Sequence, residues 1–416
     1  MRDPEWFSTR ELTASSLVRS RNRGEVWRAM RSGVPLSLGE LANQTGLSRA
    51  TISAITREML QTGIVEPLGP ASSSGGRPPA LFRYRPEARL AAGVVMFDDQ
   101  IAAVLTDLEG RPLRYIRHPW QGTDARVLLQ RIVEVVTQLL AGYDRERLLG
   151  FGVGLPGVID VPSGQVLLCI SMGWMGEPIP VRSELTKALG LPVFVANRSR
   201  MAALGELRTG VGRGLDSLLY LFLGKGVVSG LAFARGIYFG ASSTAGEIGH
   251  TTLVPDGPLC SCGNRGCLEL YTSESAIVAA AIERGRADGT SLLRRETHGN
   301  LQLLTIDTVL ACAREGDPAA VATLDEVGAQ VGLTLASALN MFNPQMLVIG
   351  GPIGTKAGPL LLCPITRELE RRTLPLTLAA VQVVTGSPED ECAVLGAAAL
   401  VLDAVSVDHI FRLDGN

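Results

Sequence analysis

The stretch His250-Thr-Thr-Leu-Val-Pro-Asp-Gly-Pro-Leu-Cys260-Ser-Cys262-Gly-Asn-Arg-Gly-Cys267 places one imidazole and three thiols in a short, turn-rich segment. Three of the chain's seven cysteines fall within these last eight residues. One imidazole and three thiolates form a complete tetrahedral ligand set for zinc, with no position left for a reactive water. The two glycines between Cys262 and Cys267 permit the tight turns that such a site needs. We therefore predict a structural zinc site; scattered core cysteines and a disulfide are the alternatives.

Two carboxylates flank this segment. Glu247 precedes His250 by three residues, a spacing that puts both side chains on one face of a helical turn. Glu269 lies two positions after Cys267. Carboxylates that accept two hydrogen bonds suit the neighbouring hydroxyls of a sugar. The sequence therefore predicts a small polar ligand near these carboxylates and the imidazole; the alternative is that the glutamates are solvated surface charges.

Length and composition set the frame for these motifs. A chain of 416 residues is expected to hold two or three domains, and 46% hydrophobic residues suffice for sizeable cores. No apolar run of about 18 residues is present, and the first residues lack the apolar core of a signal peptide. We therefore expect a cytoplasmic protein. Residues 1–90 hold 13 arginines against 8 acidic residues, and this balance of +5 fits phosphate contact by that segment.

The first ninety residues predict a winged helix-turn-helix. Ser37 and Glu40 form a capping box for a helix over 38–45, and Ser48 begins a second helix over 49–60. Two short helices joined by a tight turn are typical of the helix-turn-helix, although a helical protein–protein module is the alternative. The apolar side chains spaced to fill the core between them are Ala42, Leu47, Ile52 and Ile55.

The second of these helices carries the candidate DNA contacts near its front, where side chains meet bases and phosphates in a major groove. Two short strands, 64–66 and 81–84, follow it and are joined by 67–80. The tip Gly-Gly-Arg77-Pro-Pro resembles an AT-hook core, in which arginine enters a narrow minor groove; a flexible linker is the alternative. The predicted DNA-binding residues are Ser48, Arg49, Thr51, Ser53, Arg57 and Arg77.

From about residue 90, apolar strands alternate with helices, which favours an α/β architecture. Strands over 90–97, 101–107 and 113–116 open this part, and a similar opening returns at 217–223 and 227–233. The repeated layout predicts two related lobes with a cleft between them. Helices are further predicted over 127–140, 321–341 and 391–405, and strands over 149–153 and 346–349.

These residues resemble the ROK family (repressor, open reading frame, kinase) over essentially the whole chain. The matching motifs are residues 152–160, Asn197 at a strand end, 245–250 and 260–269, and the last two together are highly specific. The resemblance implies a two-lobed actin/hexokinase-like (ribonuclease H-like) fold with an N-terminal winged helix-turn-helix. It implies zinc held by His250, Cys260, Cys262 and Cys267, and sugar contacts from Asn197, Glu247, His250 and Glu269.

The resemblance also implies a division into domains. The expected DNA-binding domain spans residues 1–85, with its wing or linker at 67–80. A first ROK lobe is expected over 86–196, and a second lobe with the zinc site over 197–416. The final helix, 391–405, is expected to pack back on the first lobe.

The chain departs from the family's kinases where their chemistry is carried out. Those kinases have Asn-Asp at the strand end, and the Asp takes the proton from the sugar hydroxyl; here Arg198 follows Asn197, and a guanidinium cannot act as a base. The kinase turn Asp-x-Gly-Gly-Thr is replaced by 95–100, which has no glycine and two aspartates that would repel polyphosphate. The second phosphate loop, 223–230, is only partly kept. We expect no kinase activity, since losing a general base alone costs a factor of about 10² to 10⁴ in rate.

A sugar site without kinase chemistry, joined to a winged helix, predicts a sugar-responsive transcriptional regulator, and we favour a repressor. Sugar binding would close the cleft and change the spacing of paired winged helices on a palindromic operator, in a homodimer or homotetramer. An active ATP-dependent sugar kinase fused to a DNA-binding domain is one alternative, and a regulator that senses a protein partner is another. Arg198 either contacts an anion on the effector, a sugar or sugar phosphate, or pairs with Glu206 or another carboxylate; we favour the ion pair.

Overall fold

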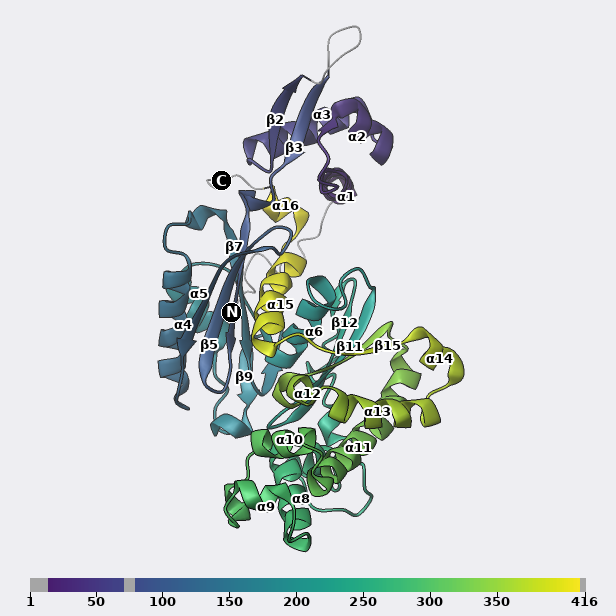
Figure 1. Cartoon of the computed structure of the whole chain (residues 1–416). Helices are drawn as coiled ribbons and strands as arrows, with labels where there is room; N and C mark the ends of the chain where they lie inside the picture. Colours follow the sequence, from purple (N-terminus) through teal and green to yellow (C-terminus); the bar gives the residue numbers. More distant parts are fainter. Residues whose placement is uncertain (1–13, 71–78, 412–416) are drawn as a thin grey trace.

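The computed structural model of the chain describes residues 14–70 and 79–411. A small domain built from the first three helices lies at one end of the first lobe, and helices α6 and α15 lie between the two lobes (Figure 1). Arg77, the predicted minor-groove contact, lies outside the described residues. No helix within the described ranges is long and apolar enough to cross a membrane.

The N-terminal domain has three helices and a three-stranded antiparallel sheet with the strand order β1-β3-β2. The predicted capping box is confirmed: the Glu40 amide donates to Ser37 Oγ over 3.3 Å, and the Ser37 amide donates to Glu40 Oε2 over 2.7 Å. Predicted core residues Ile52 and Ile55 are buried. The elements are α1 (Ala14–Met30), β1 (Leu36–Ser37), α2 (Leu38–Thr45), α3 (Arg49–Gln61), β2 (Val65–Pro70) and β3 (Ala80–Tyr84).

The first lobe is built on a five-stranded sheet with the order β10-β7-β4-β5-β6. β4, β5 and β6 are antiparallel neighbours, whereas β7 and β10 run parallel to β4. Helices α4 and α5 cover one face, and their apolar sides bury a continuous cluster against the sheet. The elements are β4 (Leu90–Met96), β5 (Gln100–Asp107), β6 (Pro112–Pro119), α4 (Ala125–Leu139), β7 (Leu148–Leu155), β8 (Val158–Asp160), β9 (Gln165–Leu168), α5 (Val181–Leu189) and β10 (Val193–Asn197).

The second lobe repeats this topology, with the strand order β13-β12-β11-β14-β15. Three antiparallel strands are again followed by two parallel ones, so the predicted two-lobed α/β fold is confirmed. The strands are β11 (Ser217–Leu223), β12 (Val227–Phe233), β13 (Gly236–Ile237), β14 (Met346–Gly350) and β15 (Gln382–Thr385). The helices are α7 (Glu269–Thr272), α8 (Glu274–Ala287), α9 (Leu292–Glu296), α10 (Ile306–Arg314), α11 (Pro318–Phe342), α12 (Gly351–Ala357), α13 (Pro359–Arg372) and α14 (Pro375–Ala380).

Helices α6 (Arg198–Arg208) and α15 (Glu389–Ala404) cross between the lobes, and their backbones are in direct contact. A Cβ on Gly205 of α6 would lie 1.8 Å from a carbonyl oxygen of α15, and a Cβ on Gly396 would lie 1.7 Å from a carbonyl oxygen of α6. A Cβ on Gly152 of β7 would lie 1.9 Å from another α15 carbonyl oxygen. Since no side chain fits at these contacts, α15 is held tightly against both α6 and the first sheet.

The end of the chain differs from the prediction. The helix predicted over 391–405 spans Glu389–Ala404, and it is not the last one, because the short helix α16 (Val407–Ile410) follows it. Val26 of α1 and Ile410 of α16 are buried in one cluster with core residues of the winged helix and of the first lobe. The N-terminal domain therefore shares a hydrophobic core with the body of the protein.

Candidate functional site

The predicted metal ligands converge. One ligand atom from each of His250, Cys260, Cys262 and Cys267 lies within 4.8 Å of all the others. The Sγ atoms of Cys262 and Cys267 are 3.7 Å apart, and Cys260 Sγ lies 3.7 Å from His250 Nδ1. A tetrahedral zinc ion with ordinary bond lengths requires S–S separations of about 3.8 Å and S–N separations of about 3.6 Å. The cluster therefore has the ligands and the dimensions of a closed, four-coordinate metal site.

The glycines of this segment behave as the sequence predicted. Gly263 and Gly266 both have positive φ, 91° and 63°. A Cβ on Gly266 would lie 1.7 Å from the carbonyl oxygen of Val254, so only glycine fits there. These turns bring Cys267 back beneath His250, whose carbonyl oxygen lies 3.6 Å from the Cys267 Sγ.

The metal-binding segment ends in Glu269, the first residue of α7. The backbone amide of Val227, at the start of β12, donates to Glu269 Oε2 over 2.9 Å. This bond links the carboxylate to the turn between β11 and β12, which corresponds to the β4–β5 turn of the first lobe. Glu269 is thus held in place by the sheet and is not a freely solvated charge.

Glu247 lies on the other side of the same segment. The predicted helical turn is present as a short 3-10 turn over Ile248–His250, directly after Glu247. Burial raises the pKa of Glu247 above its usual range, while the charges of Arg200 and His250 oppose this rise and Glu269 adds to it. Glu247, His250 and Glu269 therefore lie near one another, as predicted from their spacing.

Arg200 is a site residue whose role the sequence did not reveal. Its side chain is among the largest fully buried ones, with 1% exposure. It donates from Nη2 to Glu247 Oε1 over 3.1 Å and from Nη1 to the carbonyl oxygen of Ser243. Its guanidinium is thus committed to Glu247. A sugar bound by Glu247 would meet a carboxylate already oriented by this arginine.

Asn197 ends β10 and caps α6. Its Oδ1 accepts from the Ser199 amide, and its Nδ2 donates to the carbonyl oxygen of Gly157, both over 2.9 Å. Gly157 belongs to the 152–160 motif, so this side chain joins two of the motifs that the sequence singled out. One Nδ2 hydrogen and one Oδ1 lone pair remain for a ligand.

Arg198, the residue after Asn197, pairs with two carboxylates. It lies 3.2 Å from Asp98 through Nη1 and 3.5 Å from Glu389 through Nε, and its side chain is only 11% exposed. Its guanidinium also lies over the rings of Phe97 and Phe222. Glu206, the partner named from the sequence, accepts from the amides of residues 211 and 387 instead. The ion pair expected for Arg198 exists, with different acids.

Asp98 also pairs with a lysine of the other lobe. Lys225 Nζ lies 2.8 Å from Asp98 Oδ2. Burial alone would raise the pKa of Asp98, but the charges of Arg198 and Lys225 lower it below its usual range. The sequence predicted that this carboxylate would repel a polyphosphate, and in the structure two cations balance its charge. Burial raises the pKa of Glu389 above its usual range.

Four of the candidate DNA-binding residues, Arg49, Thr51, Ser53 and Arg57, lie on α3 outside its buried face. Arg49 and Arg57 are exposed, whereas Thr51 and Ser53 are half-buried. Ser48 is the N-cap of α3, and its Oγ accepts from the Thr51 amide over 3.2 Å. Ser48 and Thr51 therefore stabilise the helix end, and the two arginines are the predicted residues best placed for phosphate contact.

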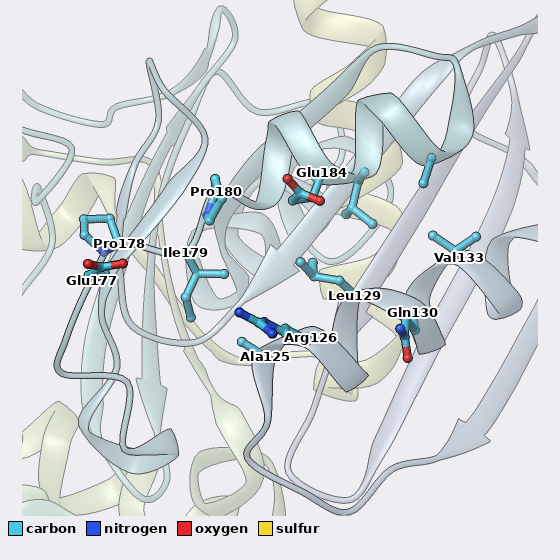
Figure 2. Close-up of a pocket in the computed structure, with 12 residues that line it drawn as sticks. Ala125, Arg126, Leu129, Gln130, Val133, Glu177, Pro178, Ile179, Pro180 and Glu184 are labelled. Carbon is cyan, nitrogen blue, oxygen red and sulfur yellow. The ribbon is translucent and has the colours of Figure 1, made fainter.

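A groove of about 630 Å³ lies elsewhere, on the outer face of the first lobe (Figure 2). Helices α4 and α5 and the segment 177–180 line it, with Arg126 and Glu184 among mainly apolar side chains. None of the four predicted sugar-site residues lines this groove. The predicted sugar-binding residues therefore lie apart from this groove.

Two family models match the chain. The ROK family model matches residues 91–404. The chain belongs to the ROK family. An IclR helix-turn-helix domain model matches residues 28–69, which hold α2 and α3. The family assigned from the motifs and the N-terminal helix-turn-helix are thus both confirmed.

Several known proteins are similar to this chain over nearly its whole length. The xylose repressor of Caldicellulosiruptor bescii is 28% identical over 93% of this chain and 96% of its own length. The DNA-binding transcriptional dual regulator NagC of Escherichia coli K12 is 28% identical over 95% of this chain and 97% of its own. The crystal structure of a ROK family transcriptional regulator, a homologue of E. coli Mlc, covers 95% of this chain and 99% of its own, at 25% identity and a TM-score of 0.80. These full-length similarities include the DNA-binding domain.

Proposed function

We propose that this ROK protein is a sugar-responsive, DNA-binding transcriptional repressor. The observation that carries the proposal is that one chain joins a helix-turn-helix at residues 28–69 to a ROK body at 91–404, as in repressors that it resembles over their full length. Such a regulator acts on DNA in the cytoplasm. We place the limits of its domains at residues 1–85, 86–196 and 197–416.

The sugar is bound by Asn197, Glu247, His250 and Glu269. Glu247 and Glu269 offer carboxylate oxygens, while Arg200 and the Val227 amide keep these two side chains oriented. Asn197 keeps one donor and one acceptor for the ligand. Neighbouring sugar hydroxyls that donate to carboxylates give the short, strong hydrogen bonds on which selective sugar binding depends.

Zinc is the metal that suits the four ligands next to this site. Three thiolates and an imidazole in a closed tetrahedron are a structural zinc set, and the measured ligand separations fit it. When bound, the ion fixes the loop. The chain's own residues then hold Glu247 and Glu269 at the two ends of that loop.

The protein lacks sugar kinase activity in this proposal. The position that carries the base in kinases of the family is Arg198, which is committed to Asp98 and Glu389. The Asp98–Lys225 ion pair spans the two turns that cradle phosphates in such kinases. An anionic effector would have to displace Asp98 from Arg198, so we assign Arg198 to the ion cluster and the sugar to the carboxylates.

DNA is bound by α3 in the major groove, with Arg49 and Arg57 on phosphates or bases. A homodimer or homotetramer would place two such helices on a palindromic operator. The sugar releases the operator by favouring one arrangement of the two lobes, and it shifts this equilibrium only by its differential affinity for the two states.

The proposal is tested by selecting a duplex from a random pool with the wild-type protein and titrating D-xylose, D-glucose and N-acetyl-D-glucosamine into the complex. We expect at least one sugar to weaken duplex binding, with no ADP release from ATP over the same sugar panel. Sugar-dependent ADP release at an enzymatic rate would favour the kinase alternative. If no sugar changed either duplex binding or thermal stability, the result would favour a regulator that senses a protein partner.

A further inference from the structure

One arginine ties the recognition helix to the C-terminal helix. Arg23, in α1, donates from Nε to Oε2 of Glu58 in α3 over 2.8 Å. It donates from Nη1 to Oδ1 of Asp408 in α16 over 2.6 Å. The side chain is 15% exposed, and its guanidinium lies 5.8 Å from the centre of the Phe411 ring. Arg23 therefore joins α1 to both α3 and α16. In the sequence, 376 residues (31–406) separate the end of α1 from the start of α16.

The geometry of guanidinium makes this link directional. The group is planar and its donors form a rigid fork, so two carboxylates bound on different edges define an angle between their helices. Charge-assisted hydrogen bonds are roughly twice as strong as neutral ones, and this group is largely shielded from water. Arg19 also pairs with Glu58, but on the exposed side of α1.

Asp408 offers a firm anchor for this fork. Its helix, α16, continues from α15, which is held at backbone distance against α6 and the first sheet. The first residue of α15, Glu389, pairs with Arg198 in the ion cluster between the lobes. The apolar cluster that contains Val26 and Ile410 holds the domain on the body, while the Arg23 fork restricts its rotation.

We propose that Arg23, held by Asp408, is a positioning residue that sets the angle of the recognition helix α3 on the effector body. The inference rests on the proposed role of α3 in DNA binding. It predicts that sequence-specific binding depends on a carboxylate in the C-terminal helix that itself need not touch DNA. Nonspecific binding to phosphates depends mainly on charge and is insensitive to this angle.

The test compares Asp408→Asn with Glu109→Gln as a matched control. Glu109 of the first lobe pairs with Arg31 just after α1, so it also links the N-terminal domain to the body, but through a residue that is not part of the Arg23 fork. The readout is affinity for the selected duplex divided by affinity for a random-sequence duplex, without sugar. We expect Asp408→Asn to lower this ratio about tenfold and Glu109→Gln to change it less than about twofold.

Two further measurements distinguish this inference from the proposed function. Asp408→Glu should recover the ratio, and the effects of Asp408→Asn and Glu58→Gln should be non-additive, because both act through Arg23. Amide exchange in α3, which needs neither DNA nor sugar, should rise in Asp408→Asn more than in Glu109→Gln. Equal exchange in the two variants, or equal specificity ratios, would overturn the positioning role even if the protein proves to be a sugar-responsive repressor.

Discussion

Asp98 and Lys225 join the corresponding turns of the two lobes through an ion pair of 2.8 Å. Asp98 follows β4 and Lys225 follows β11, the first strands of the two sheets. Asp98 also pairs with Arg198 over 3.2 Å, so the chain's own charges join the two lobes at this point.

An aspartate at position 198 should not confer sugar kinase activity. In Arg198→Asp the new carboxylate would lie beside Asp98 and Glu389, so we expect repulsion and a loss of about 3 to 5 kcal/mol in unfolding free energy, as for a broken buried pair. ADP release should stay at the wild-type level, because the glycine-containing phosphate turn is still absent. A coupled ADP assay and chemical denaturation check both outcomes; turnover by this variant would contradict them.

The Asp98 ion pairs should make stability depend on acid pH. The folded-state pKa of Asp98 is lowered, so its stabilising contribution is present above the unfolded pKa of about 4 and is lost as pH falls through the lower folded value. The difference in unfolding free energy between wild type and Asp98→Asn should therefore shrink as the pH falls below about 4. Lys225→Met should lower the unfolding free energy less than Asp98→Asn does. Lys225 is 64% exposed, so its ion pair with Asp98 contributes only about 0 to 1 kcal/mol.

Removing one metal ligand should affect metal content and stability together. Cys262→Ser leaves three ligands, and we expect stoichiometric zinc in the wild type, its loss in the variant, and a lower melting temperature. Cys363→Ser is the control, since Cys363 is an exposed cysteine in α13, far from the cluster in sequence. Elemental analysis and thermal unfolding give the two readouts. Unchanged zinc in Cys262→Ser would rule out this ligand set.

The effector site is tested by Glu247→Gln. A hydrogen bond to a charged group contributes about 1.5 to 3 kcal/mol, so we expect affinity for the inducing sugar to fall about 10- to 100-fold in calorimetry. Duplex affinity without sugar should remain, because Glu247 lies in the second lobe. Glu134→Gln, on the exposed face of α4, should leave sugar affinity unchanged. If both variants bound the sugar with equal affinity, Glu247 would not belong to the sugar site.

The recognition helix is tested by Arg49→Ala and Arg57→Ala. We expect each to weaken duplex binding about tenfold, and an arginine on phosphate should also reduce the dependence of log affinity on log salt by about one. Arg131→Ala, an exposed arginine of the first lobe, serves as the control for net charge. A salt titration in a fluorescence anisotropy assay separates the effects. Wild-type affinity in both α3 variants would exclude this face of α3 as the DNA contact.

Local patterns were sufficient for much of the fold and for the metal cluster. The Ser37–Glu40 box, most strands of the two sheets and the long helix around 321–341 are encoded by short-range spacing and are present, whereas the edge strands β13 and β15 were not predicted. The four metal ligands are near one another in sequence, so their convergence needed only the turns at Gly263 and Gly266. Helices α5, α8–α10 and α12–α14 were not predicted, because their apolar faces pack against distant elements that local periodicity does not identify.

The sequence by itself determined the family, the repeat of two lobes, the four residues of the candidate metal cluster and the place of Arg198 directly after Asn197, since each depends on residue type at a fixed local spacing. Only the tertiary structure decided which carboxylates Arg198 meets, that buried Arg200 orients Glu247, and that Arg23 links α3 to the end of the chain. The hydrogen-bonded partners among these residues are 35 to 385 positions apart in the sequence. Charged side chains pair with the groups that lie close to them in space. The packing of α6, α15 and α16 brings these paired side chains close together.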